Sequence, residues 1–205
     1  VKEITTALGK SKFVVEDVKK GTRCKKAPLP FTTSTLQQEA SKALNFSTSK
    51  TMRIAQQLYE GVEIKGQGTV GIITYLRTDS TRISDEAMAL ARDYISSQYG
   101  EKYVGEEVAA KKTGGKIQDA HEAIRPTDIA RTPQLLKESL NRDQLRLYQL
   151  IWKRFVASRM QPAHYEQKQA RISAGKYIFT VNASKLVYDG YMAVYNNEED
   201  NPFLD

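Results

Sequence analysis

The hydrophobic pattern of this chain changes its period twice, and that change constrains the fold more than any other feature. Apolar residues among charges at 13–18, and alternating ones at 177–181, are typical of β-strands. In the long stretch between them, apolar residues recur at helical spacing. We therefore predict an α+β fold. Residues 1–27 and 163–205 form a β-domain that is discontinuous in sequence. Residues 28–162 form an α-helical domain inserted between these two segments.

The N-terminal part of the β-domain is expected to be strand-like throughout, with Gly9 and Gly21 at turns. Residues 10–26 carry seven basic side chains against two acidic ones, a formal net charge of +5. Such a run most often keeps an edge strand from pairing with other chains, and contact with DNA is the alternative. Residues 27–30, which contain two prolines, form a stiff connector to the insertion.

Capping residues predict the helices of the insertion. Ser34 and Gln37 fit a capping box for a helix that Asn45 can end. Ser47 or Ser49 is expected to begin the next helix, which stops at Gly61. The two helices fit either a helix-turn-helix or an ordinary helical hairpin.

Three further helices are expected later in the insertion. One is capped by Ser84 and closed by Gly100. Another begins at Thr132-Pro133, because proline suits the first helical position. Asn141 caps a longer amphipathic helix in which Trp152 belongs to the core.

One short stretch of the insertion carries a candidate nucleophile. The apolar run from Val70 to Ile73 predicts a buried strand that leads directly to Tyr75, with Arg77 two residues further on. On a strand these two side chains would point to the same face. A phenol can attack phosphorus, and a guanidinium can hold phosphate oxygens and stabilise developing negative charge. The alternative is a tyrosine that packs and an arginine that is solvated.

A histidine and an arginine form a second candidate element. His121 and Arg125 are four residues apart, so a helix ending at Pro126 would present both on one face. A histidine can give or take a proton and an arginine can pair with phosphate oxygens, so the pair suits a phosphodiester. The alternative is a histidine at a helix end beside a solvated arginine. No metal site is expected, because the chain has one further histidine and a single cysteine.

Three strings of the sequence resemble signatures of type IA DNA topoisomerases. They are PFTTSTLQQ at residues 30–38, ITYLRTDST at residues 73–81 and DAHEAIRPT at residues 119–127. They occur in the family's order and with family-like spacing, and the resemblance covers essentially the whole chain. Leu76 and the TDSTRIS that follows resemble the bacterial topoisomerase I branch more than the topoisomerase III branch.

The resemblance implies a function and a set of site residues. Tyr75 would be the nucleophile, and Arg77 would lower its pKa and stabilise the phosphate. The helical domain would be CAP-like. Residues implied in DNA binding are Thr33, Ser34, Thr35, Gln37, Thr78, Asp79, Ser80, His121, Arg125 and Thr127.

The whole enzyme would cleave one DNA strand without ATP through a 5′-phosphotyrosyl link, pass the other strand and reseal the break, which relaxes negative supercoils. The family's D-x-D-x-E magnesium site lies in a Toprim domain, and no such pattern occurs in this chain. We expect no cofactor in the chain itself and Mg²⁺ in the full-length enzyme. We read the chain as a piece of that enzyme, inactive in relaxation alone, with single-stranded or negatively supercoiled DNA and the Toprim domain as partners.

Composition and motif order limit the alternatives. A net charge of +7 and a pI near 9.3 favour a polyanionic partner. One cysteine, Cys24, excludes an internal disulfide, and the absence of a long apolar run or a signal peptide favours a cytoplasmic protein without membrane contact. A tyrosine recombinase would place its tyrosine after the histidine, and a rolling-circle nuclease would need an H-x-H pair. A single-stranded DNA-binding module without catalysis remains the rival function.

Overall fold

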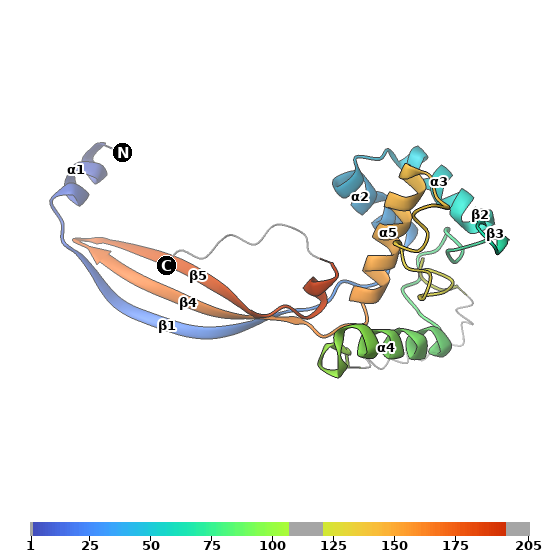
Figure 1. Cartoon of the computed structure of the whole chain (residues 1–205). Helices are drawn as coiled ribbons and strands as arrows, with labels where there is room; N and C mark the ends of the chain where they lie inside the picture. Colours follow the sequence, from blue (N-terminus) through green and yellow to red (C-terminus); the bar gives the residue numbers. More distant parts are fainter. Residues whose placement is uncertain (1, 107–120, 196–205) are drawn as a thin grey trace, which may run out of the picture. The chain divides into compact units, whose positions relative to one another are not determined.

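The computed structural model describes residues 2–106 and 121–195 (Figure 1). The fold is mixed α+β, and the chain forms two compact units. Of the described residues, the first unit contains 2–26 and 162–190, and the second contains 27–106, 121–161 and 191–195.

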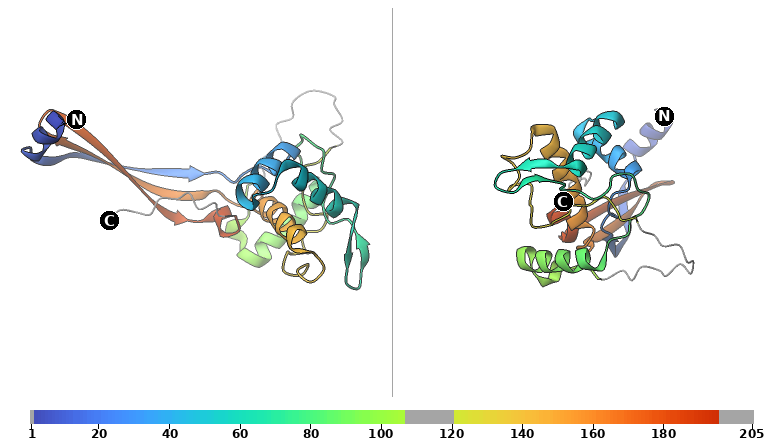
Figure 2. Two further views of the ribbon diagram at one scale, coloured as in Figure 1. Left: turned by 90° about the horizontal axis from the view of Figure 1, so that it is seen from above. Right: turned by 90° about the vertical axis from the view of Figure 1, so that its right-hand side faces the viewer.

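An antiparallel sheet of three long strands builds the first unit. The strands are β1 (Phe13–Lys25), β4 (Ala163–Ala174) and β5 (Tyr177–Tyr188), in the order β1-β4-β5. Both views show β1 alongside the β4–β5 hairpin (Figures 1 and 2). A strand from before the helical insertion thus pairs directly with one that follows it. As the basic run predicts, β1 is an edge strand.

The N-terminal residues differ from the expected strand. Lys2–Gly9 form the helix α1. Glu3 lies in its first turn, where the helix dipole favours an acid, and Ile4, Ala7 and Leu8 have helical spacing. The strand-like residues 13–18, on which the prediction is based, lie outside this helix. Gly21 is not at a turn either, because it pairs with Gln167 in the middle of β1.

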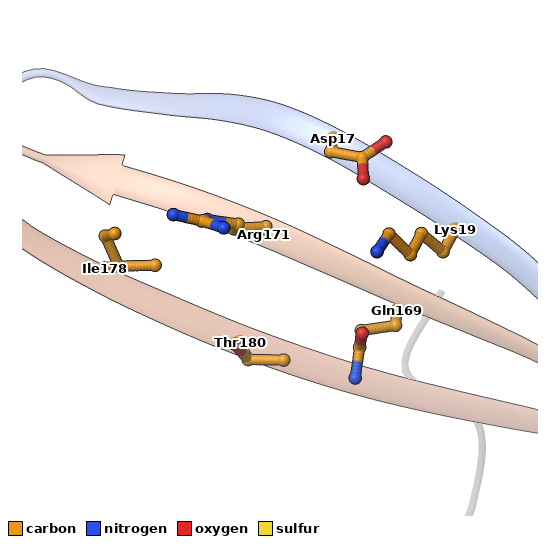
Figure 3. A pocket seen from close by; sticks show the side chains of 6 residues that line it. All are labelled: Asp17, Lys19, Gln169, Arg171, Ile178 and Thr180. Carbon is orange, nitrogen blue, oxygen red and sulfur yellow. The ribbon is translucent and has the colours of Figure 1, made fainter.

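The two faces of the sheet differ in polarity. The register aligns Val15 with Ile172 and Ile172 with Phe179, so these side chains share an apolar face. Phe13 joins them, its ring centroid 5.9 Å from that of Phe179. The opposite face is mostly polar and has a shallow hollow (Figure 3). This hollow is lined by Asp17, Lys19, Gln169, Arg171, Ile178 and Thr180.

Three helices form the centre of the second unit. They are α2 (Thr33–Leu44), α3 (Thr48–Glu60) and α5 (Arg142–Ala157), and they pack against one another. Among the fully buried side chains are Leu36, Leu58, Leu147, Ile151 and Phe155. The helix α4 (Asp85–Tyr99) and the short 3₁₀ helices η1 (Glu101–Tyr103) and η2 (Gly190–Ala193) complete the helical elements.

A small hairpin follows α3. It consists of β2 (Val62–Ile64) and β3 (Gly68–Val70), joined by a turn at residues 65–67. Figure 2 shows it projecting beyond the end of α3. This hairpin leads into the segment that carries Tyr75.

Most of the predicted helix ends are confirmed. Asn45 ends α2 in the left-handed conformation (φ 58°), and Ser47, Ser84 and Asn141 cap α3, α4 and α5 with their side chains. The capping box of α2 is formed by Thr32 and Thr35, however, not by Ser34 and Gln37.

The helix expected at Thr132-Pro133 is absent, and residues 131–140 form a succession of turns. Side chains of α5 fix this irregular segment and the residues before it. The Tyr148 hydroxyl donates to the Arg131 carbonyl at 2.6 Å, and the Trp152 indole donates to that of Ile129 at 2.9 Å. Trp152 is buried, as predicted.

Candidate active site

Tyr75 lies outside any strand, between the β-bridge residue Ile73 and a bend at residues 76–77. Strand β3 already ends at Val70, so the prediction of a strand reaching Tyr75 is wrong. Side chains nevertheless alternate from Tyr75 to Ser80, the odd positions exposed and the even ones buried. Tyr75 and Arg77 are therefore both exposed, as the two-residue spacing implies.

The three signature strings meet around this segment. The Ile124 N–H donates to the Phe31 carbonyl at 2.8 Å, and the Thr74 N–H donates to the Arg125 carbonyl at 2.9 Å. The Thr33 N–H donates to the Thr78 carbonyl at 2.9 Å. Residues 30–38, 71–80 and 121–127 therefore lie side by side, although they are far apart in sequence.

The segment with His121 and Arg125 is extended, so the predicted helix is wrong. Ile124 forms a β-bridge with Phe31, and Pro126 forms one with Ile73. Pro126 has no N–H and disfavours helical backbone at the residue before it, which suits this conformation. Asp119 and Ala120, at the start of the string, lie outside the described residues.

The side chains of Tyr75 and Arg77 are exposed to solvent. Tyr75 is 46% exposed, and the edge of its ring meets Tyr59 of α3, with the centroids 5.4 Å apart and the planes at 66°. The Tyr75 hydroxyl makes no hydrogen bond with any described residue. Within the same described ranges, Arg77 forms neither a hydrogen bond nor an ion pair. Both groups are thus available to a ligand.

A shallow pocket adjoins the phenol. Its lining consists of Thr74, Tyr75, Thr78, His121 and Glu122. His121 is exposed and shares this pocket with Tyr75, although the two residues are 46 positions apart. The candidate nucleophile and the candidate proton-transfer or phosphate-binding group are thus brought together.

Arg125 is occupied within the protein. Its guanidinium donates to Glu122 Oε2 at 2.6 and 3.1 Å and to the Pro126 carbonyl at 3.0 Å, and its side chain is only 13% exposed. Burial raises the pKa of Glu122, but hydrogen bonds and charge from Arg125, with hydrogen bonds from Ser84, outweigh it and leave that pKa lowered. The carboxylate is therefore ionised at neutral pH and holds Arg125 in place.

Most of the predicted DNA-binding hydroxyls also have partners inside the protein. Thr35 belongs to the capping box, and the Thr127 hydroxyl donates to the Gly71 carbonyl at 3.0 Å. The Thr78 hydroxyl accepts from the Ser80 N–H at 3.0 Å, and the Ser80 hydroxyl accepts from the Arg82 N–H at 3.1 Å. Ser34 and Asp79 are exposed and Gln37 is half-buried.

Three residues of the site were not singled out from the sequence. Thr74 and Glu122 stand inside the quoted strings, so their position next to candidate residues is a usable signal. Tyr59 lies in α3, and no local pattern links it to Tyr75.

Two general features follow from the described residues. In ranges 2–106 and 121–195, no group of three or more His, Cys, Asp and Glu side chains could hold a metal ion. No helix in those ranges has the length and apolar character needed to cross a membrane.

Comparison with known proteins agrees with this arrangement. The family model for DNA topoisomerase matches residues 1–203. The full-length topoisomerase I from Thermotoga maritima, solved in a monoclinic crystal form, is 44% identical to this chain with a TM-score of 0.85. That match covers 100% of this chain but only 34% of the Thermotoga maritima chain, so this chain spans about one third of its length. The chain belongs to the DNA topoisomerase family, in its bacterial type IA branch.

Proposed function

We propose that this chain is the part of a type IA topoisomerase that carries the nucleophile, and that Tyr75 attacks a DNA backbone phosphate. The complete enzyme cleaves one strand, passes the other strand through the break and reseals it, which relaxes negative supercoils. The helical unit takes the role of the family's CAP-like domain. The proposal also makes the protein cytoplasmic, in keeping with its DNA substrate.

The convergence of the three signature segments around an exposed Tyr75 is the observation that carries this proposal. Backbone hydrogen bonds at residues 31, 74 and 78 join the three segments. The phenol at their junction has no described hydrogen-bond partner, and His121 lines the same pocket.

The bond changes balance without an external energy source. The Tyr75 oxygen forms a bond to phosphorus while the bond from phosphorus to the 3′ oxygen breaks. The phenol proton leaves to a base, and the departing 3′ oxygen takes up a proton. One phosphodiester replaces another, so resealing is the same step reversed. Arg77 is the candidate for stabilising charge on the phosphate, and His121 for binding that phosphate or its neighbour.

Magnesium needs ligands from elsewhere. The described residues include no cluster fit for a metal ion. As the resemblance to the family implies, Mg²⁺ would be held by a Toprim domain of the complete enzyme.

A non-catalytic single-stranded DNA-binding module is the second candidate, which the net charge of +7 favours. Tyr75→Phe in the complete enzyme separates the two. It removes one exposed hydroxyl and keeps the ring against Tyr59, so folding and DNA affinity should persist while relaxation and cleavage disappear. Wild-type relaxation by this variant would refute the assignment of Tyr75.

A further inference from the structure

Two threonine hydroxyls add to the few backbone hydrogen bonds that hold the Tyr75 segment. The first belongs to Thr33, at the start of α2. Its Oγ1 donates to the Leu76 carbonyl at 2.7 Å and accepts from the Thr78 N–H at 2.9 Å. One side chain therefore satisfies the backbone groups on both sides of Arg77.

The second hydroxyl belongs to Thr74, the residue before Tyr75. Its Oγ1 donates to the Ala123 carbonyl at 2.7 Å and accepts from the Arg125 N–H at 3.0 Å. Like the Thr33 hydroxyl, it bonds the backbone groups on both sides of one residue, here Ile124 in the neighbouring segment. In both cases a hydroxyl supplies the donor and acceptor that a paired strand residue would supply.

These contacts bracket Tyr75. Thr74 precedes it and is tied to residues 123 and 125, and Leu76 follows it and is tied to Thr33. The exposed phenol itself has no described hydrogen bond, so the position of its oxygen depends on the backbone on either side and on the ring contact with Tyr59. A reacting atom displaced by about 1 Å can lose on the order of a hundredfold in rate.

We propose that Thr33 and Thr74 are positioning residues for the nucleophile, and that Thr33 acts through this backbone clamp instead of contacting DNA. The inference rests on the proposed function of Tyr75. It replaces the expectation, drawn from resemblance, that Thr33 binds the nucleic acid.

The test compares Thr33→Val, Thr33→Ser, Thr74→Val and Thr74→Ser in the complete enzyme. Valine has nearly the same shape but lacks the hydroxyl, whereas serine keeps it. With a saturating single-stranded oligonucleotide, each valine variant should cleave roughly 10- to 100-fold more slowly at an unchanged Kd. Each serine variant should return to within a few-fold of wild type.

Thr51→Val is the matched control. Thr51 is completely buried, and its hydroxyl donates to the Ser47 carbonyl at 2.9 Å within the first turn of α3. This change should lower thermal stability by a similar amount and leave the cleavage rate unchanged. If Thr74→Val does not fold, Thr33→Val alone decides the question.

Three results would overturn the inference: wild-type cleavage by folded valine variants, an equal loss of rate in Thr51→Val, or a raised Kd for Thr33→Val with an unchanged rate. Tyr75→Phe in the same series distinguishes a wrong positioning role for the threonines from a wrong assignment of Tyr75 as the nucleophile. An inactive Tyr75→Phe beside fully active valine variants refutes only the positioning role, whereas an active Tyr75→Phe refutes the proposed nucleophile.

Discussion

Gly71→Ala should damage the active site through the backbone alone. Gly71 begins the Tyr75 segment, and a Cβ atom there would lie 2.5 Å from the Tyr59 carbonyl oxygen at the end of α3. Ordinary contact begins near 3.4 Å, so the segment and α3 must separate by about 0.9 Å. The adjoining hydrogen bond from the Ile72 N–H to the Leu58 carbonyl, 2.8 Å long, would be strained by the same movement.

The expected effects follow from that displacement. Overpacking of this kind costs about 1–3 kcal/mol of the free energy of unfolding. Because Tyr75 lies four residues further along, its oxygen should be displaced by a similar distance, and cleavage should slow by on the order of a hundredfold. The assay is single-turnover cleavage of a labelled oligonucleotide by the complete enzyme, beside its thermal melting curve.

Gly105→Ala is the control for lost stability. Its added Cβ would lie 2.7 Å from the Arg159 carbonyl oxygen, a comparable clash in the same unit. Among the described residues, no backbone hydrogen bond joins Gly105 to the Tyr75 segment. It should lower the melting temperature and leave the cleavage rate intact. Equal cleavage rates for Gly71→Ala and wild type, or equal losses in both variants, would refute the reasoning.

Three further changes have separate expected outcomes. Arg77→Ala removes an exposed guanidinium without a described partner, so the melting temperature should be unchanged while cleavage slows by on the order of a hundredfold. An unchanged cleavage rate would exclude Arg77 from catalysis. Glu122→Gln should cost about 1.5–3 kcal/mol at pH 7. Because the pKa of Glu122 is lowered in the folded protein, the wild type loses its extra stability over Glu122→Gln as pH falls below the ordinary value of about 4.5. The difference in melting temperature between the two proteins should therefore narrow at acidic pH. A difference that stays constant with pH would contradict this prediction. Tyr148→Phe leaves the Arg131 carbonyl without its donor and should cost about 1–3 kcal/mol by urea denaturation, with cleavage unaffected; an unchanged midpoint would contradict that bond.

Local signals were read well from the sequence. The caps at Ser47, Ser84 and Asn141 depend on residues within three positions, so their pattern is visible without knowledge of the fold. The β–α–β change of hydrophobic period also gave the correct order of strand-rich and helix-rich stretches. The shared face of Tyr75 and Arg77 followed from their two-residue spacing, although no strand extends to them.

Signals that depend on distant partners were missed. Residues 121–127 have helical spacing but are extended, because their hydrogen-bond partners are Phe31, Ile72, Thr74 and Arg82. The Thr33 hydroxyl donates to the Leu76 carbonyl, 43 positions away, and no local pattern indicates this partner. In both cases the hydrogen-bond partners lie far away in the sequence, so no local pattern contains them.

The most direct test of the central claim maps the covalent bond to DNA. The complete enzyme is incubated with a single-stranded oligonucleotide labelled at one end, denatured and digested, and the peptide that carries nucleotide is identified by mass spectrometry. The account predicts that a 3′ label stays with the protein, that the fragment with a 5′ label is released with a free 3′-hydroxyl, and that the modified peptide contains Tyr75. A nucleotide attached to any other residue, or an adduct that persists in Tyr75→Phe, would contradict it.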